Sequence, residues 1–516
     1  MYTISRLVLC AMLAWSISVQ AQSTLLPVQV DPVEPKAPVF PPTSGGNNPF
    51  PVLERPPVTP MPIEVTPQPG AIKPIPEQPI VPVLPPVSPK TGDSGKQEMP
   101  KESVILPPPT EPKVELPKSP EKSKASEWYD KLKIRGYTQV RSSFPFLTDV
   151  TSAQPFHDGD ASIGENQNFL IRRARLIFYG DLSEHISFYF QPDFAATVPG
   201  SLDSNEYAQL RDLYADVYLT QDKVHRFRVG QSKVPYGWEN LQSSSNRLAF
   251  DRNDAFNSAT KNERDIGVFY YWTPEYAQEI FKFVSSGLKG SGNYGVFGIG
   301  IYNGQGGALQ EQNDNLHIVT RLQIPYRFDN GQIVEAGIQA YTGKYTVLSS
   351  SIRALGVGPS IRPEGTLERS NRAGLRDERV GGTFIVYPQP LGFQAEWNVG
   401  RGPALSDDQR RVEVRSLTGG YLQTMYMFDV EDCGTWTPFV RWSYFQGGYK
   451  SARNAPYSRI DEWDLGVEWQ YSKWLEFTTM YTITDRTNTR AIDTPGVVPY
   501  GQYQGHILRF QLQFNY

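Results

Sequence analysis

The stretch that decides the fold is ILRFQLQFNY, residues 507–516, at the carboxy terminus of the chain. Apolar and polar side chains alternate along it, and successive side chains of a β-strand point to opposite faces of the sheet. The apolar set is Leu508, Phe510, Leu512, Phe514 and Tyr516, and the polar set is Arg509, Gln511, Gln513 and Asn515. Such a regular apolar face indicates contact with lipid, with the polar face turned toward water.

The same alternation recurs upstream as far as Trp128, in runs bounded by Gly, Asn, Asp and Pro. We identify sixteen such runs, at 131–142, 167–182, 185–195, 209–221, 225–232, 264–272, 293–303, 313–327, 332–345, 376–388, 391–400, 411–428, 434–446, 459–471, 474–485 and 504–516. One helix interrupts them. Thr273 can cap it, Pro274 suits its first position, and apolar residues follow at helical spacing.

The connections between these runs sort by length. With the amino terminus in the periplasm, most inner connections are tight, as at 182–185, 329–331 and 388–390, whereas long connections occur on the outer side. An even number of strands with long outer loops and short inner turns is typical of bacterial outer-membrane barrels. We therefore predict an all-β protein, a transmembrane antiparallel β-barrel of about 16 strands.

The segment before the barrel has a different composition. Residues 1–21 combine Arg6, an apolar run at 7–17 and a small-x-small motif at 19–21, which predicts a signal peptide. Residues 22–127 hold most of the prolines, which predicts a disordered periplasmic linker that buries no core. This proline-rich arm is either a tether to the cell wall or an unattached extension. Residues 128–516 are the predicted barrel domain.

Composition excludes several other classes of protein. No later stretch approaches the roughly 18 apolar residues of a transmembrane helix, and the 64 aromatic residues (10 Trp, 28 Tyr and 26 Phe) suit girdles at the membrane interfaces. Cys433 is the only cysteine outside the signal peptide, so no internal disulfide is possible. The five histidines are scattered and no GxSxG or HExxH motif occurs. We expect no catalytic residues, no metal, no cofactor and no nucleic-acid partner.

The net charge is only −4, so any preference for anions must come from the local placement of charge. Parity within the strands places a basic wall in the lumen near the closure of the barrel, made by Lys133, Arg135, Arg173, Arg175 and Arg509. It places Asp193, Asp212 and Asp216 opposite. Arg172 fits this parity poorly. The two charged walls either create a transverse field for polar solutes or simply form ion pairs within the wall.

Four motifs together carry a family resemblance. They are NFLIRRARL at 168–176, FYFQPDF at 188–194, LYAD at 213–216 and RVGQSKVPYG at 228–237. The chain from about Tyr129 to Tyr516 resembles the phosphate-selective porin O and P family, whereas the proline-rich arm is not part of the likeness. The resemblance implies a sixteen-stranded, trimeric outer-membrane porin for passive diffusion of small solutes, above all anions such as phosphate.

The resemblance also implies that the third loop, Lys233–Glu263, folds inward as a constriction loop. Its candidate anion-binding residues are Lys233, Arg247, Arg252 and Lys261, which are matched in number by Glu239, Asp251, Asp254 and Glu263. The fifth external loop, Thr346–Leu375, is locally positive through Arg353, Arg362, Arg369 and Arg372. These loop arginines either guide anions inward or are solvated and contact lipopolysaccharide.

The terminal Tyr516 resembles the assembly signal of outer-membrane proteins, so we expect the barrel assembly machinery as a partner, together with lipid, small anions and two further copies in a homotrimer. The alternative function is structural. In that case the barrel anchors the proline-rich arm, and the arm holds the cell wall or a periplasmic partner. Channel conductance in planar bilayers separates the two functions.

Overall fold

The structure is a computed structural model that describes residues 128–147, 162–163, 169–195, 208–307, 311–347, 374–407, 409, 411–489 and 500–516. The predicted signal peptide and proline-rich arm lie outside these ranges. So do most of the fifth external loop and its arginines Arg353, Arg362, Arg369 and Arg372.

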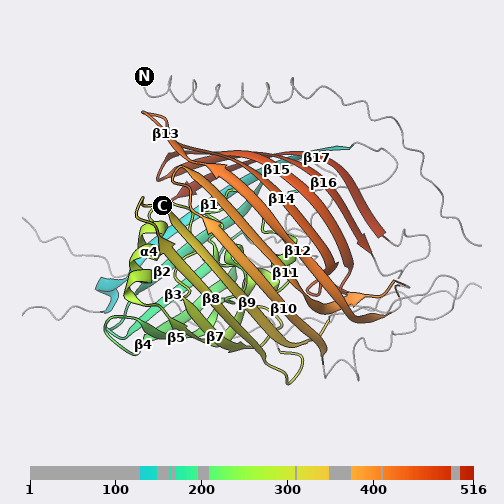
Figure 1. The fold of residues 1–516 in the computed structure, drawn as a ribbon, viewed down its shortest axis with the longest axis horizontal. Coiled ribbons are helices and arrows are strands. Elements are labelled where there is room, and N and C mark those ends of the chain that lie inside the picture. The colour runs from blue at the N-terminus through green and yellow to red at the C-terminus, as the bar shows by residue number, and fades with distance from the viewer. Residues whose placement is uncertain are drawn as a thin grey trace, which may run out of the picture. The chain divides into compact units, whose positions relative to one another are not determined.

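The described chain forms one closed antiparallel sheet (Figure 1). Its strands are β1 (Lys133–Leu147), β2 (Phe169–Asp181), β3 (Ile186–Asp193), β4 (Gln209–Tyr218), β5 (His225–Lys233), β6 (Arg264–Trp272), β7 (Phe297–Tyr302), β8 (His317–Arg327), β9 (Ile333–Tyr345), β10 (Leu375–Val386), β11 (Leu391–Leu405), β12 (Val412–Tyr426), β13 (Phe428–Val430), β14 (Gly434–Gly448), β15 (Tyr457–Ser472), β16 (Leu475–Thr489) and β17 (Tyr500–Asn515). Each pairs with its neighbours, and β17 pairs with β1. β12 and β13 share the partner β14, so the seventeen segments make a barrel of sixteen strands.

Every predicted run coincides with a strand, which confirms the predicted barrel. The reason is the strict alternation of the sequence, since a pattern of period two forms one apolar and one polar face. The predicted helix is also present, as α4 (Glu275–Ser285). The prediction of its cap was wrong, because Pro274 occupies the capping position and no side chain caps the helix.

The two faces of the strands follow the predicted parity. In β17, Arg509, Gln511 and Gln513 are buried in the lumen, whereas Phe514 is 41% exposed on the outer face. The exception in β2 has a local cause. The register with β1 shifts there, since Gln139 lies opposite Arg173 and Val140 lies opposite Ile171. Arg172 is therefore the extra residue of a β-bulge, which explains why it did not fit the parity.

The seam between β1 and the chain terminus depends on a glycine. The backbone N–H of Gly136 donates to the carbonyl of Tyr516, 2.6 Å away, and the N–H of Tyr516 donates back over 2.9 Å. A Cβ atom at Gly136 would lie 2.3 Å from the ring of Tyr516 and 2.5 Å from the carbonyl oxygen of Arg175. A residue without a side chain therefore fits best where Tyr516 pairs with β1.

Strand length differs around the barrel, as Figure 1 shows. The strands β3 to β7 have 8, 10, 9, 9 and 6 residues. The strands β11, β12, β14, β15, β16 and β17 have 15 or 16 residues. None of the helices in the described ranges has the length and apolar character needed to cross a membrane.

The lumen holds most of the remaining helical structure. The constriction loop contains α2 (Trp238–Leu241), α3 (Asp254–Asn257) and the 3-10 turn η2 (Lys261–Glu263), while the 3-10 turn η1 (Trp128–Lys131) precedes β1. At one end of the barrel, which we call the turn mouth, tight turns join β2 to β3, β8 to β9 and β10 to β11. The helix α4 lies in the connection between β6 and β7 at this same mouth.

Candidate functional site: the lumen and its constriction loop

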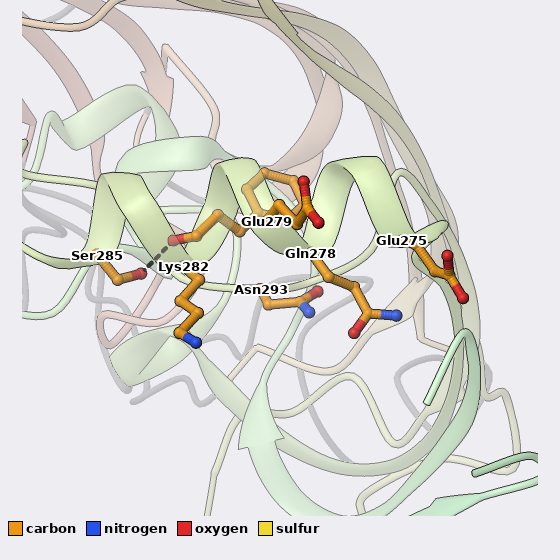
Figure 2. A pocket seen from close by; sticks show the side chains of 7 residues that line it. Glu275, Gln278, Glu279, Lys282, Ser285 and Asn293 are labelled. Carbon is orange, nitrogen blue, oxygen red and sulfur yellow. Dashed lines mark hydrogen bonds between the residues drawn. The ribbon is translucent and has the colours of Figure 1, made fainter. Parts of the chain in front are cut away.

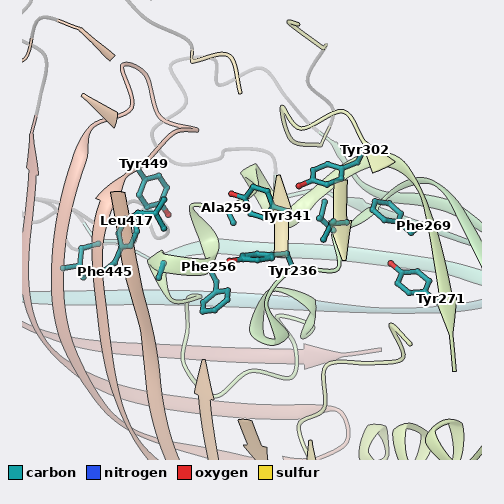
Figure 3. Packing of buried hydrophobic residues seen from close by; sticks show 14 residues of the cluster. Tyr236, Phe256, Ala259, Phe269, Tyr271, Tyr302, Tyr341, Leu417, Phe445 and Tyr449 are labelled. Atoms are coloured by element: carbon teal, nitrogen blue, oxygen red, sulfur yellow. The ribbon is translucent and has the colours of Figure 1, made fainter. Parts of the chain in front are cut away.

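The constriction loop fills part of the lumen by apolar packing (Figure 3). Tyr236 and Phe256 of the loop are fully buried and belong to one cluster with Tyr341 of β9 and Phe445 of β14. Further along the loop, Leu248, Ala249 and Phe250 pack against Met425, Phe439 and Met480 on the opposite wall. Because these contacts reach strands far from β5 and β6, the loop crosses the barrel instead of following its rim.

Wall arginines hold the same loop by its carboxylates. Arg141 and Arg509 both contact Asp251, at 3.1 and 2.6 Å. Three more arginines on other strands act similarly: Arg441 contacts Glu239 at 2.6 Å, Arg486 contacts Asp254 at 3.0 Å, and Arg379 donates to the carbonyl of Ala255 at 2.8 Å. All are buried, so each ion pair or hydrogen bond is shielded from water. The acidic residues of the loop therefore serve as its attachment points.

Of these wall arginines, Arg141, Arg379, Arg441 and Arg486 are missing from the sequence-based candidates. For Arg141, Arg379 and Arg441 the signal was available, because each lies in a predicted strand at a position of lumenal parity, whereas Arg486 lies one residue beyond the predicted run 474–485. What the sequence did not provide was their partner, since Glu239 is 202 residues from Arg441 and Asp254 is 232 residues from Arg486.

The acids that were predicted to lie opposite the basic wall are paired with arginines of nearby strands, one of which, Arg175, belongs to that basic wall. Asp193 pairs with Arg175 at 2.7 Å, Asp212 with Arg264 at 2.8 Å and Asp216 with Arg228 at 2.8 Å. These partners lie on the adjacent strands or one strand beyond. Each of these three aspartates therefore has an arginine partner.

The residues of the predicted basic wall fall into three situations. Arg175 and Arg509 are ion-paired, with Asp193 and Asp251. Lys133 and Arg135 are exposed at the turn mouth, where the guanidinium of Arg135 lies 5.4 Å from the ring centre of Tyr179.

Arg173, the remaining residue of the predicted basic wall, is neither ion-paired with a described carboxylate nor exposed. It is only 4% exposed and donates to the amide oxygen of Gln139 at 2.7 Å. Its Nε has no hydrogen-bond partner, and it contacts no carboxylate among the described residues.

The candidate cations of the constriction loop also differ from one another. Arg252 pairs with Glu263 at 2.6 Å, and the Lys233 ammonium donates to the carbonyls of Leu241 and Gln242 at 2.8 and 2.9 Å. Lys261 is partly exposed.

Arg247 is 4% exposed and makes one hydrogen bond, to the carbonyl of Phe250 at 3.2 Å. Its Nε and Nη1 have no partner within the described ranges. Burial and the nearby charge of Arg252 lower the pKa of Arg247, against the opposing charges of Glu239, Asp251 and Glu263. Arg247 lies on the loop and not on a membrane-spanning strand. The positive charge of Arg247 is one of several that act on Arg173. The structure thus holds two buried guanidinium groups that contact no carboxylate among the described residues.

Across the described ranges, no three His, Cys, Asp or Glu side chains are arranged to hold a metal ion.

Comparison with known proteins places the fold in a family. The model of the family "Phosphate-selective porin O and P" matches residues 150–516. No curated protein matches the sequence.

Several solved structures of outer-membrane proteins are similar at low identity. OmpT of Vibrio cholerae has 10% identity and a TM-score of 0.44, covering 75% of this chain and 100% of its own. OmpF of Salmonella typhi, in complex with daunomycin, has 12% identity and a TM-score of 0.46, covering 75% and 97%. An anion-selective porin from Comamonas acidovorans has 11% identity and a TM-score of 0.41, covering 75% and 99%. At these values the structural neighbours carry no argument, and the assignment rests on the family model. The chain belongs to the phosphate-selective porin O and P family and is an outer-membrane porin for passive diffusion, not an enzyme.

Proposed function

We propose that this porin favours small anions, and that Arg173 and Arg247 are the groups that attract them within the lumen. The observation that supports this is their lack of carboxylate partners among the described residues, although both side chains are buried. Guanidinium groups match the oxygens of phosphate and of carboxylates in pairs, so an anion would satisfy donors that the described residues leave open. Phosphate is the proposed physiological anion.

The paired arginines contribute less to this preference. Arg175, Arg252 and Arg509 each contact a carboxylate, so an anion would have to compete with an existing ion pair. Lys133, Arg135, Lys233 and Lys261 contact no carboxylate among the described residues and are the secondary candidates. The four arginines of the fifth external loop are further candidates at the outer entrance.

The test is the reversal potential of single channels in a salt gradient. Replacing Arg173 by Ala should lower the anion-to-cation permeability ratio about fivefold. Two unit charges about 4 Å apart in water interact by about 1 kcal/mol, which corresponds to this factor. Arg247→Ala should act similarly. The matched control is Arg376→Ala, which removes the same charge from a side chain that is 63% exposed. Unchanged reversal potentials in R173A and R247A would exclude their role.

A second measurement tests the proposal of phosphate. Millimolar phosphate should reduce the chloride current of the wild type by occupying the pair, and this block should disappear in the R173A/R247A double variant. Equal block in both proteins would show that phosphate binds elsewhere. If phosphate did not block the wild type, the proposal of phosphate would be wrong and only a general preference for anions would remain.

We also propose that the porin assembles as a homotrimer through the outer face of β3 to β7. A transmembrane strand needs about 9–11 residues, and β3 and β7 have only 8 and 6. Apolar side chains on this face, such as Val229, which is 47% exposed, are suited to cover by neighbouring copies. The longer strands meet the membrane thickness on their own.

A pair of matched variants tests the trimer. Val229→Lys should dissociate it into monomers, whereas Val399→Lys on β11, where the valine is 53% exposed, should not. Chemical cross-linking of the purified protein in detergent reads the result. A monomeric wild type, or dissociation by both variants alike, would contradict the proposal. The remaining proposed partners are membrane lipid and the barrel assembly machinery, and we propose that the amino-terminal arm lies in the periplasm.

A further inference from the structure

The connection between β6 and β7, residues 273–296, differs from the tight turns at the same mouth. It begins with α4, whose residues Ala277 and Phe281 are buried against Val296 at the end of the connection. Val284, on the next turn, packs in a separate cluster with Trp238 of the constriction loop and with Ile333 and Ile385 on the wall. The helix is thus fixed both to its own connection and to the interior of the barrel.

After α4 the chain turns inward at Lys289. The φ angle of Lys289 is +61°, a region that side chains other than glycine rarely adopt. A Cβ atom at the following Gly290 would lie 2.4 Å from Val284, so the turn is packed tightly onto the helix. This backbone conformation brings the Lys289 side chain into a buried position, with 5% exposure.

The buried ammonium of Lys289 is held by two carboxylates on distant strands. It contacts Glu468 of β15 and lies 3.9 Å from Glu476 of β16. Burial opposes its charge, but Glu468 and Glu476 raise the pKa of Lys289 overall, so the ion pair persists. Since β15 and β16 are several strands from β6 and β7 in either direction around the sheet, the connection reaches across the turn mouth.

The same turn is joined to the constriction loop. The side-chain amide of Gln242 donates to the carbonyl of Lys289 at 2.5 Å, and that of Asn246 donates to the carbonyl of Gly290 at 2.8 Å. Both contacts are shielded from solvent at least in part. The two segments that enter the lumen are therefore tied to each other as well as to the wall.

Beside α4 there is a cavity of about 500 Å³ (Figure 2). It is lined by Glu275, Gln278, Glu279, Phe281, Lys282, Ser285 and Asn293. Polar side chains dominate this lining, as expected of a surface in contact with water. One face of the connection is therefore bound into the barrel and the other borders an open polar space.

We propose that residues 273–296 form a strap across the turn mouth that sets the size limit for solutes, and that Lys289 is its latch. A simple turn would join β6 to β7 without crossing the opening. A buried lysine in a left-handed backbone conformation, contacting carboxylates across the barrel, keeps the strap across the path. The proposal rests on the porin activity but not on its preference for anions.

The test compares two lysines of the strap. Lys289→Met keeps the length of the side chain and removes its charge, which leaves Glu468 and Glu476 without their cation. Single-channel conductance should rise about twofold or more as the strap moves off the mouth. Swelling of proteoliposomes in uncharged sugars of increasing size should show a higher size limit. The control is Lys282→Met, because Lys282 lines the cavity, and both measurements should remain at the wild-type values.

A second variant approaches the latch from the wall. The double substitution Glu468→Gln and Glu476→Gln should reproduce the effect of K289M. The single substitution Lys289→Arg keeps the positive charge and should retain most of the wild-type conductance and size limit. Heat-modifiable migration in gel electrophoresis identifies folded barrels of each variant. Folded barrels of K289M or of the double Gln variant with wild-type conductance and size limit would overturn the proposal, as would an equal change in K282M.

These outcomes are separate from those of the anion proposal. The strap predicts changes in conductance and in the permeation of neutral sugars, whereas the anion proposal predicts changes in reversal potential. A latch variant that alters size selection at an unchanged reversal potential supports the strap alone.

Discussion

Arginine–carboxylate ion pairs have different roles on two sides of the lumen. On the loop-binding wall, formed by β1, β14, β16 and β17, the arginines contact carboxylates of the constriction loop. On the self-paired wall, formed by β2 to β6, arginines contact Asp193, Asp212 and Asp216 of the wall itself. Pairs of the first kind hold the constriction loop against the wall, whereas pairs of the second kind only neutralise the wall.

This comparison changes how a basic lumen is interpreted. An arginine that faces water-filled space is available to a solute only if no carboxylate of the protein already contacts it. By that criterion the number of lumenal arginines overestimates the attraction for anions. Arg173 and Arg247 lie between the two arrangements, because neither wall supplies a described partner for them.

The largest expected effect comes from breaking one ion pair on each wall. Glu239→Gln leaves Arg441 without its carboxylate, and Asp216→Asn does the same to Arg228. Each should lower the free energy of unfolding by about 3–5 kcal/mol, because a buried charge loses its partner. Urea unfolding of the barrel in lipid vesicles measures the loss.

Only the first substitution should also alter the channel. Glu239 joins the loop to the wall, so E239Q should increase the open-channel noise and shift the conductance, whereas D216N should leave both unchanged. Equal noise in the two variants would remove the distinction between the walls. Equal stability of E239Q and the wild type would show that the Arg441 pair contributes little to the fold.

A smaller effect is expected at the seam that holds the loop-binding wall closed. Gly136→Ala places a methyl group 2.3 Å from the ring of Tyr516, and overpacking of this kind costs about 1–3 kcal/mol. The matched control is Gly382→Ala on β10, where a Cβ atom has no neighbour within 4 Å. The urea midpoint should fall for G136A and remain unchanged for G382A. If the urea midpoint of G136A equalled that of G382A, Tyr516 would move aside at no cost in stability.

The strands could be predicted from the sequence because their information is local. Alternation located all sixteen and gave the lumenal face of Arg173, Arg175 and Arg509 correctly. It failed locally at Arg172, where a bulge inserts one residue and reverses the parity. A bulge depends on the register of two strands, so the sequence of one strand does not reveal it.

The partners of the lumenal charges could not be predicted, because they depend on the path of the constriction loop. Asp251 counts as one acid of a balanced loop in the sequence, but in the fold it contacts Arg141 and Arg509 across the lumen. Likewise, Lys289 appears in the sequence as an ordinary residue after a helix, and its partners Glu468 and Glu476 are about 180 residues away. The loop sequence correctly showed equal numbers of basic and acidic residues. It did not distinguish Arg252, which is paired with Glu263, from Arg247, which contacts no carboxylate among the described residues.

The smallest effect is expected for an ion pair that is exposed to water, which can be compared with the buried pairs of the lumen. Lys223 and Asp181 lie 3.7 Å apart near the turn mouth, with side chains that are 39% and 55% exposed. Asp181→Asn should change the free energy of unfolding by less than about 1 kcal/mol, because water and salt screen an exposed pair. The same chemical change at Asp216 removes a carboxylate that is 7% exposed and should cost several times more. Urea unfolding of D181N and D216N at low and high salt measures both the size and the screening of the effect. If D181N lost as much stability as D216N, burial would not be the reason for the strength of the lumenal pairs, and the difference between the two walls would then have to come from geometry alone.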